Sequence, residues 1–322
     1  MVSNAIRTLA AVLLLAGLAG CVSATAPASA QSASADAASV TATPAPTLPP
    51  EPAGPPYTAP PLATSDFHAD AAGGGNGALI DTSATAQGYV AVSATSDKAL
   101  KFQVLYGDTT YNYDLPGDGT PTSFVLQSGS GTYTFRVMEN VTGTKYATLY
   151  STEAEVALAD EFQPFLRPSQ MVAYTADSAC VAKAAELTRG ATSEIGVLSR
   201  IYAYIAANVA YDYDKAKTVQ DGYLPNPDDT LASGKGICFD YAALAAAMLR
   251  SQGLPTKMIT GYVSPDGIYH AWDMVWLTQT GWVTVEIEAP ANQWSRVDLT
   301  FAAGGGTAFT GDGTSYTDRY VY

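Results

Sequence analysis

Cys238, His270 and Asp298 are residues whose types and order in the chain could carry out nucleophilic catalysis together. A thiol attacks a carbonyl carbon as the thiolate, so it needs a base that takes its proton. An imidazole base needs a carboxylate to fix its tautomer and its orientation. The order therefore predicts a nucleophile, a general base and an orienting acid for acyl transfer.

The sequence around Cys238 favours this role over that of a buried small hydrophobe. Two glycines precede it and allow the backbone to turn tightly, and the alanine-rich run Ala242–Leu249 predicts a helix that Gly253 ends. Cys238 is then at a helix N-terminus, where the helix dipole favours the thiolate and free N–H groups could hold an oxyanion. Cys180 has no such surroundings and is predicted to be a packing residue.

Helices and strands are both expected around these residues. Ser193 can cap a helix whose apolar residues recur at 3.6-residue spacing as far as Ile205. His270 begins one of four strands that should follow the cysteine helix, at residues 256–262, 271–278, 282–288 and 296–299.

Four blocks in this region carry a resemblance to a known family. They are Gly236-x-Cys238-x-x-Tyr241-Ala242, Gly261-Tyr262, His270-Ala271-Trp272 and Val297-Asp298-x-Thr300-Phe301. Residues 193–303 thereby resemble a bacterial transglutaminase-like domain of the papain-like cysteine enzymes. The resemblance implies an α+β fold in which the cysteine helix packs on an antiparallel sheet. It also implies Cys238 as nucleophile, His270 as base, Asp298 as orienting acid, and no cofactor.

Two departures from the family pattern leave the carboxylate open. Asp273 follows the His-Ala-Trp block where the family often has asparagine, and residues 286–290 lengthen the path from His270 to Asp298. Asp273 and Glu288 therefore stay as alternatives to Asp298. A zinc site on the cysteine, histidine and aspartate is a further alternative, but no C-x-x-C or H-x-x-x-H spacing supports it.

The N-terminus predicts export and lipid attachment. Arg7 precedes an apolar run of the length of a signal-peptide core, and Leu18-Ala19-Gly20-Cys21 follows. This run resembles a bacterial lipobox, which implies a lipid on Cys21 and cleavage before it. An ordinary cleaved signal with a chance cysteine is the alternative. We expect an extracytoplasmic protein anchored to the bacterial membrane through Cys21, since multiple acyl chains anchor stably.

The amino-acid composition of the rest of the chain indicates a tether followed by folded regions. Residues 22–65 are mainly Ala, Pro, Ser and Thr, which predicts a disordered tether, with His68 solvated just beyond it. A series of about seven short segments then suggests an immunoglobulin-like β-sandwich, with the segments near Tyr89, Phe102, Tyr111, Phe124, Phe135, Tyr146 and Val156. The predicted parts are a signal peptide at 1–20, a lipid-anchored tether at 21–75, a β-sandwich at 76–160 and a transglutaminase-like catalytic domain at 161–322.

The charge balance excludes several kinds of partner. The chain has 16 Lys and Arg against 30 Asp and Glu, a net charge of −14. It lacks the clustered cations that nucleic acid or an anionic lipid surface would need. We therefore expect no nucleic acid, membrane contact through the lipid anchor alone, and a protein or peptide substrate, with cell-wall peptide as one candidate.

Three functional hypotheses remain at this point. The first is a surface-anchored thiol enzyme that cleaves or transfers acyl groups from peptide or glutamine amides through a thioester. The second is a non-catalytic envelope lipoprotein that keeps the fold and binds wall polymer or a partner through the sandwich. The third is a structural or adhesive lipoprotein in which the tether matters most. The intact Cys-His-Asp set favours the enzyme.

Overall fold

The computed structural model describes residues 51–263, 268–285 and 316–322. The chain divides into two units, residues 1–43 and 44–322, and all described residues belong to the second. Cys21 and Asp298 lie outside the described residues. In the part of the chain that is described, no helix is long and apolar enough to cross a membrane.

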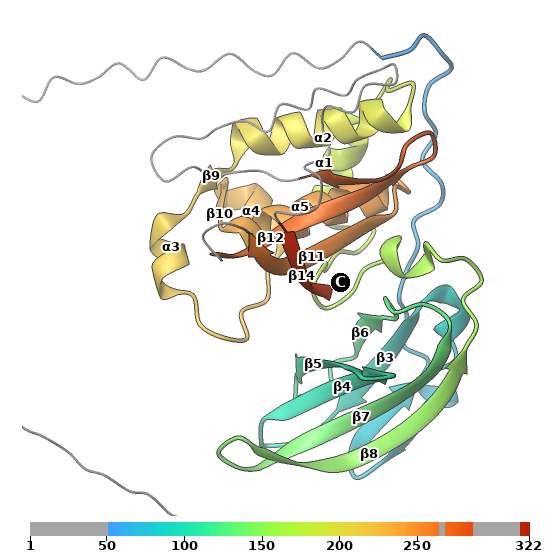
Figure 1. Ribbon diagram of the computed structural model, residues 1–322, viewed down its shortest axis with the longest axis vertical. Coiled ribbons are helices and arrows are strands. Elements are labelled where there is room, and N and C mark those ends of the chain that lie inside the picture. The colour runs from blue at the N-terminus through green and yellow to red at the C-terminus, as the bar shows by residue number, and fades with distance from the viewer. Residues whose placement is uncertain (1–50, 264–267, 286–315) are drawn as a thin grey trace, which may run out of the picture. The chain divides into compact units, whose positions relative to one another are not determined.

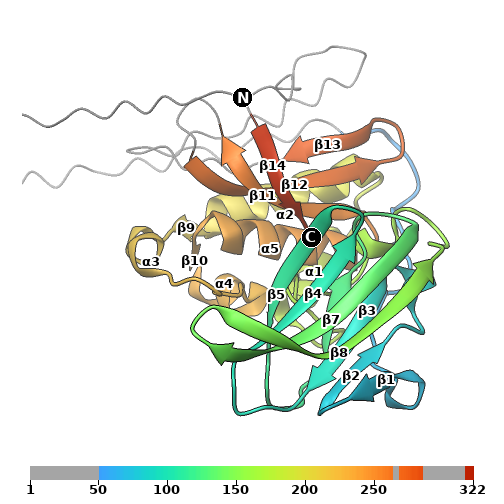
Figure 2. The ribbon, with the colours of Figure 1, turned by 60° about the horizontal axis from the view of Figure 1, so that its bottom comes forward.

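The first half of the described chain forms two four-stranded antiparallel sheets (Figure 2). One sheet has the order β1-β2-β3-β6 and consists of β1 (Gly73–Gly75), β2 (Ala78–Asp81), β3 (Tyr89–Ala94) and β6 (Thr122–Val125). The other has the order β5-β4-β7-β8 and consists of β4 (Leu100–Tyr106), β5 (Thr109–Leu115), β7 (Gly131–Thr142) and β8 (Lys145–Val156).

Residues with a period of two form the core between these sheets. In β7 the side chains of Tyr133, Phe135 and Val137 are all buried, as their alternation predicts. Phe102 of one sheet meets Phe124 of the other with ring centroids 4.6 Å apart. A sheet region therefore precedes the helical part, as expected, although the segments predicted near Tyr146 and Val156 belong to the one long strand β8.

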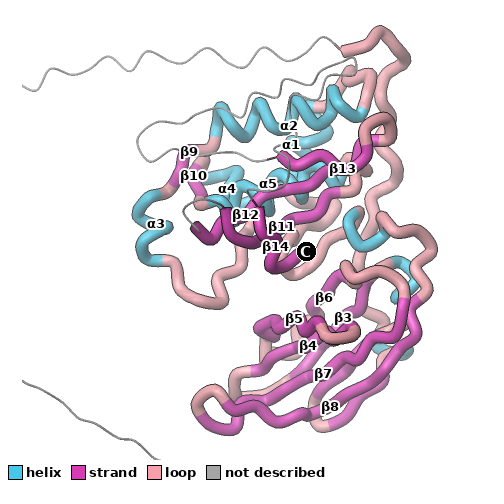
Figure 3. The backbone as a smooth tube through the Cα atoms, viewed as in Figure 1, coloured by secondary structure: helices cyan, strands magenta, loops and turns pink. Residues whose placement is uncertain are grey.

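The second half contains five α-helices and a four-stranded antiparallel sheet among its described residues (Figures 1 and 3). The helices are α1 (Ala179–Leu187), α2 (Glu194–Asn208), α3 (Tyr213–Thr218), α4 (Pro227–Ser233) and α5 (Cys238–Ser251). The sheet has the order β13-β12-β11-β14 and consists of β11 (Thr256–Val263), β12 (Ile268–Leu277), β13 (Gly281–Val285) and β14 (Tyr316–Val321). A two-stranded parallel pair joins β9 (Ala210–Tyr211) and β10 (Lys235–Gly236).

Helix α5 is the centre of this half. Its alanines are almost fully buried, and it contacts α1, α2 and α4 as well as β11 and β12. Small side chains let neighbouring helices approach closely, which is why an alanine-rich helix can be surrounded on all sides. The mixed fold, with the cysteine helix packed on an antiparallel sheet, is therefore confirmed.

The buried side chain of Arg250 connects the end of α5 to three other segments through hydrogen bonds. The Arg250 side chain is 1% exposed, and it donates to the carbonyl oxygens of Thr256 at 2.9 Å, Arg167 at 2.9 Å and Tyr322 at 2.8 Å. Burial lowers the pKa of this guanidinium to about 10. Since charge-assisted hydrogen bonds are the strong ones, these contacts fix where α5 ends relative to β11 and the C-terminal strand.

Part of the predicted tether packs against the folded chain instead of standing free. Glu51 pairs with Arg200 at 2.9 Å, and the Tyr57 hydroxyl donates to the Gln252 carbonyl at 2.8 Å. We call residues 51–67 the strap. Its composition hides these contacts, because Pro and Ala dominate the segment and anchoring side chains such as Glu51 and Tyr57 are few.

The end of the predicted tether also differs. Gly73–Gly75 forms β1, an edge strand of the first sheet, although three glycines carry no strand signal. His68 is not simply solvated, because its Nδ1 lies 3.0 Å from a carboxylate oxygen of the buried Asp81. Burial raises the pKa of Asp81, but hydrogen bonds from Ser83 and His68 outweigh it and hold that pKa below its ordinary value.

Candidate active site

Cys238 is the first residue of α5, as the glycines and the alanine run predict. Its side chain is half-buried, and it lines a small cavity together with Tyr202, Tyr241, Trp272 and Asp273. These residues come from α2, α5 and β12, and Val285 of β13 completes the wall. The thiol is therefore at a helix N-terminus in a partly enclosed, aromatic setting.

A buried aspartate holds the turn that presents the thiol. Asp240 is 0% exposed, and one of its oxygens accepts from the Ile237 backbone N–H at 2.8 Å and from Lys215 Nζ at 2.7 Å. Its other oxygen accepts from the Tyr223 hydroxyl at 2.5 Å. Burial lowers the pKa of Lys215, but its bonds to Asp240 and Tyr223 outweigh this and raise that pKa. This network fixes the backbone directly before Cys238.

Glycine is needed two positions before the cysteine. A Cβ added at Gly236 would lie 2.6 Å from Cβ of Asp240, a distance that real Cβ atoms do not show. The Gly236 carbonyl accepts from the Asp212 N–H at 2.9 Å, which holds the approach to α5 against β9. The sequence motif Gly-x-Cys therefore has a steric cause.

His270 is on β12, where its Cα partner across the sheet is Gly261 of β11. The two residues that follow it, Ala271 and Trp272, line the same cavity as Cys238. Gly261 adds no side chain opposite His270 on the β11 side. The structure thus brings Ala271 and Trp272 of the His-Ala-Trp block to the cavity at the start of the cysteine helix.

The structure describes only one of the three carboxylates that could orient His270. Asp298 and Glu288 lie outside the described residues, so Asp298 stays a prediction. Asp273 is fully buried in the cavity wall and accepts a hydrogen bond from the Tyr202 hydroxyl at 3.0 Å. Burial raises the pKa of Asp273 well above its ordinary value, although the bond from Tyr202 lowers it. Because burial penalises the charged form of this carboxyl group, Asp273 is a poor counter-charge for an imidazolium.

Cys180 also lies in the first turn of a helix, α1, but unlike Cys238 it is fully buried. It is 0% exposed in the core around α1 and α5. Burial, and then the neighbouring Asp228 carboxylate, raise the pKa of its thiol far above the ordinary value. It is the packing residue that the sequence predicts.

A second histidine cluster has the right residue types but the wrong geometry for a nucleophilic triad. The Asp81 carboxylate lies 3.0 Å from Nδ1 of His68, and the Ser83 hydroxyl lies 3.5 Å from the same Nδ1. A triad needs the acid on one ring nitrogen and the nucleophile on the other. This cluster is therefore a structural contact of the first sheet.

The sequence alone does not predict the hydrogen-bond network around Asp240 or the hydrogen bond from Tyr202 to Asp273. Aspartate three residues into a helix, after an extended residue, is a capping signal that could have shown the bond to the Ile237 N–H. Nothing in the local sequence shows that Lys215 and Tyr223 reach the same carboxylate. Among the described residues, no group of three His, Cys, Asp or Glu side chains could hold a metal ion.

Residues 181–287 match the family model of the transglutaminase-like superfamily. The chain carries a transglutaminase-like domain. The match includes Cys238 and His270 and ends before Glu288 and Asp298.

Curated relatives share only part of this domain. The UPF0252 protein of Methanocaldococcus jannaschii is 33% identical over 67 residues, which are 19% of this chain and 19% of that protein. An uncharacterized protein of Mycobacterium leprae is 29% identical over 92 residues, 26% of this chain and 31% of its own length. The chain thus matches about a fifth to a third of the length of these relatives.

Solved structures show a remote similarity. A candidate cysteine protease from Cytophaga hutchinsonii is 17% identical, with a TM-score of 0.33 over 60% of this chain and 68% of its own. Red sea bream transglutaminase is 13% identical, with a TM-score of 0.27 over 62% of this chain and 48% of its own. The assignment of the transglutaminase-like domain rests on the family model and on the site described above.

Proposed function

We propose that the transglutaminase-like domain is a thiol enzyme that cleaves or transfers acyl groups from peptide or glutamine amides. The observation that supports it most is the place of Cys238, at the start of α5 and in one cavity with the residues that follow His270. A helix start supplies unpaired N–H groups and a positive dipole end. Both stabilise a thiolate and an oxyanion.

The proposed reaction has two halves. In the first, His270 takes the proton of Cys238, sulfur bonds to the amide carbonyl carbon, and N–H groups of the first turn of α5 hold the oxyanion. The C–N bond then breaks, His270 gives its proton to the departing nitrogen, and a thioester remains. In the second, His270 takes a proton from the attacking water or amine, the C–S bond of the thioester breaks, and that proton passes to the sulfur, which restores the thiol. Water gives hydrolysis and an amine gives transamidation.

The carboxylate that orients His270 is proposed to be Asp298, with Glu288 as the alternative. Asp273 is less suited, because burial disfavours the charged form of its carboxyl group, and only the charged form balances an imidazolium. The family match reaches residue 287 and so includes Glu286, which makes Glu286 a further carboxylate to test.

The experiment is intact-mass and product analysis after incubation with a glutamine-containing peptide, with and without a primary amine. A covalent adduct that Cys238→Ala removes, followed by an acid product or an amine-linked product, supports the proposal and separates hydrolysis from transamidation. Absence of any adduct or product with a series of such peptides would favour a non-catalytic binding protein instead.

We also propose that the mature chain is anchored to the membrane through a lipid on Cys21. Support comes from the Leu18-Ala19-Gly20-Cys21 run after an apolar segment. Cys21→Ser should move the protein from the membrane fraction to the soluble fraction, and metabolic labelling with a fatty acid should be lost. A variant that stays in the membrane fraction would contradict this.

A further inference from the structure

Two tyrosines and an arginine form an exposed cluster at one end of the sheet β13-β12-β11-β14. Tyr262 of β11 and Tyr269 of β12 are 41% and 48% exposed, and Arg319 of β14 is also exposed. Tyr262 and Tyr269 are Cα partners across the two strands, and their ring centroids lie 5.3 Å apart. We call these three residues the tyrosine–arginine cluster. All three side chains are within reach of a ligand that arrives from solvent.

Hydrogen bonds and ring contacts hold the cluster in one arrangement. The Tyr269 hydroxyl donates to Oγ1 of Thr260 at 2.8 Å, and Nη1 of Arg319 donates to the Tyr262 hydroxyl at 3.2 Å. The Arg319 guanidinium also lies over the ring of Tyr320, with its Cζ 5.3 Å from the ring centroid, which is a cation–π distance. Because these side chains lose little further freedom when a ligand binds, the cluster is suited to recognition.

The charge of Arg319 selects an acidic ligand. The ion pairs of the described part of the chain all involve other cations, so no described carboxylate neutralises Arg319. A guanidinium presents its N–H groups in a planar fork that matches the two oxygens of a carboxylate. An uncharged saccharide would stack on the tyrosines but leave this positive charge without a partner.

The net charge of the chain requires that this attraction be local. A charge of −14 repels an acidic ligand at long range, but at about 0.15 M ionic strength charges are screened beyond about 8 Å. The contact with Arg319 itself must therefore supply the selectivity. Tyrosine and arginine are also among the residues that most often dominate the binding energy of polypeptide interfaces, which favours a peptide as the ligand.

The cluster lies at the end of the sheet where α5 begins. α5 ends at Ser251 and packs on β11, which begins at Thr256, so the chain reverses between them. The 14 residues of α5 span about 21 Å and the 8 residues of β11 about 26 Å, so Tyr262 returns to the level of the α5 start. Met258 is buried against α5, and Tyr262, four residues on, projects from the same face of the sheet. A peptide bound at Cys238, the first residue of α5, can therefore extend to the cluster.

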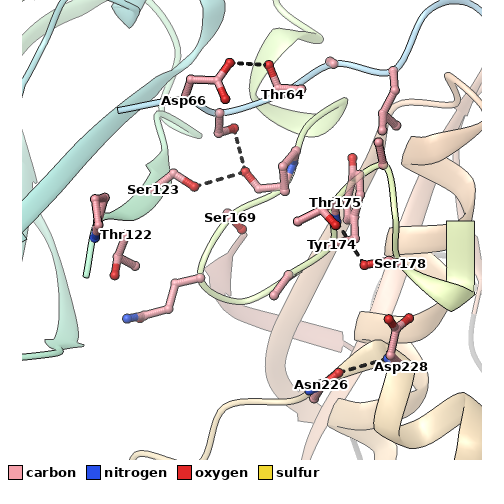
Figure 4. Close-up of a pocket in the computed structure, with 18 of the residues that line it drawn as sticks. Thr64, Asp66, Thr122, Ser123, Ser169, Tyr174, Thr175, Ser178, Asn226 and Asp228 are labelled. Carbon is pink, nitrogen blue, oxygen red and sulfur yellow. Dashed lines mark hydrogen bonds between the residues drawn. The ribbon is translucent and has the colours of Figure 1, made fainter. Parts of the chain in front are cut away.

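A wide cavity elsewhere in the described chain offers less to a polar ligand (Figure 4). Its volume is about 730 Å³, and it opens between the strap and the segments at the starts of β6, α1 and α4. The Thr64 hydroxyl in its wall donates to Asp66 at 2.7 Å, and the Ser65 hydroxyl donates to the Pro168 carbonyl at 2.8 Å. The Asp228 carboxylate accepts from the first two backbone N–H groups of α1. These groups are bound to the chain itself, whereas those of the tyrosine–arginine cluster face solvent.

We propose that the tyrosine–arginine cluster binds an acidic residue of the peptide substrate, so that the domain prefers peptides with a carboxylate near the amide that Cys238 attacks. The inference rests on the proposed function for the identity of the ligand as substrate. Binding at the cluster can nevertheless be measured without the chemistry. The cluster determines specificity, because it is outside the set of groups that touch the reacting atoms.

Calorimetric titration of the full chain carrying Cys238→Ala tests the proposal, at about 0.15 M ionic strength. The probe is acetyl-Glu-Glu-Gly-Gln-Gly-Glu-Glu-amide, which has acidic residues on both sides of its central glutamine. The comparisons replace every glutamate by glutamine or by lysine, and chitotetraose is the uncharged saccharide. We expect the acidic peptide to bind with a Kd below about 1 mM and at least about fivefold more tightly than the glutamine peptide.

Substitutions of Arg319 identify the group that recognises the carboxylate. Arg319→Gln should abolish the preference for the acidic peptide, and Arg319→Glu should reverse it, so that the lysine peptide binds more tightly. Arg189→Gln removes a cation at an exposed position outside the cluster and should leave the preference unchanged. The position of Arg319 is exposed, so these variants should fold, and far-UV spectra check this.

The proposal is overturned if the acidic and glutamine peptides bind equally, if neither binds, or if the preference survives Arg319→Gln. It is also overturned if chitotetraose binds and the acidic peptide does not. Acid-selective binding through Arg319, without any adduct or product in the wild type, would support the cluster and contradict the thiol chemistry. Turnover of both peptides with the same KM would support the chemistry and overturn the cluster.

Discussion

Asp273 is a buried carboxyl group whose contribution to stability depends on pH. Its pKa is raised in the folded chain, so the folded state holds a proton that the unfolded state releases above about pH 4. Stability therefore falls as pH rises from about 4 toward the folded pKa, by up to about 1.4 kcal/mol per pH unit. Asn at this position does not titrate.

Asp273→Asn should consequently gain stability relative to the wild type as pH rises above 4. Urea unfolding of both proteins at several pH values measures this difference. Asp97→Asn, at an exposed position, is the matched control and should follow the wild type. Parallel curves for wild type and Asp273→Asn would show that the carboxyl is ionised in the folded chain.

The acid that orients His270 can be identified by replacing each candidate carboxylate, one at a time, with its amide. Asp298→Asn should lower turnover by about 10²–10⁴-fold, because the imidazole loses the group that fixes its tautomer. Glu286→Gln, Glu288→Gln and Asp273→Asn are made in parallel, with far-UV spectra as the check on folding. An unchanged rate for Asp298→Asn together with a large loss in one of the others would move the role to that residue.

The turn before α5 depends on one carboxylate, so Asp240 is the residue to remove. Asp240→Ala should lower the free energy of unfolding by about 3 kcal/mol, because it leaves Lys215 and the Ile237 N–H without their partner. Asp214→Ala, in the first turn of α3 and exposed, should cost little. Urea unfolding gives both values.

The alkylation rate of Cys238 in Asp240→Ala shows whether Asp240 positions the thiol as well as stabilising the fold. If the network positions the thiol, folded Asp240→Ala should also alkylate more slowly at Cys238. A loss below about 0.5 kcal/mol with unchanged alkylation would contradict both roles of Asp240.

Local sequence signals predict some elements well. The alanine run and its flanking glycines predict α5, and period-two alternation predicts β4 and β7, because each signal reports which side chains of one element face the core. The place of Cys238 at a helix start follows from the same signals.

Other features depend on residues far apart in the sequence. Lys215 and Tyr223 reach Asp240 through the path of the chain after α2, and no local pattern carries that information. β1 exists because it pairs with β2, not because glycine favours strands. The choice among carboxylates stays open because spacing alone does not fix which one meets His270.

At the scale of the whole molecule, the strap joins the predicted anchor to the transglutaminase-like domain. Tyr57 contributes most clearly, through its hydroxyl bond to Gln252 and its N–H bond to the Ala191 carbonyl at 2.6 Å. Burial raises the pKa of the Tyr57 hydroxyl to about 12, which agrees with a neutral donor.

Tyr57→Phe should therefore lower the free energy of unfolding by about 1 kcal/mol. Tyr146→Phe, at a half-buried position of β8, is the control and should cost less than half of that. A chain that starts at residue 68 should lose more than Tyr57→Phe does, because Glu51 and Thr64 also lose their contacts with Arg200 and Arg167. Equal stability of the shortened and longer chains would show that the strap does not hold to the domain in solution.

The proposed function requires that Cys238 is a nucleophile activated by His270. The most direct measurement is the rate of alkylation of each cysteine by iodoacetamide in the folded protein, resolved by peptide mass spectrometry. Cys238 should react at least about 100-fold faster than the buried Cys180, and His270→Ala should slow Cys238 while leaving Cys180 unchanged. Equal, slow alkylation of both cysteines, unaffected by His270→Ala, would contradict it.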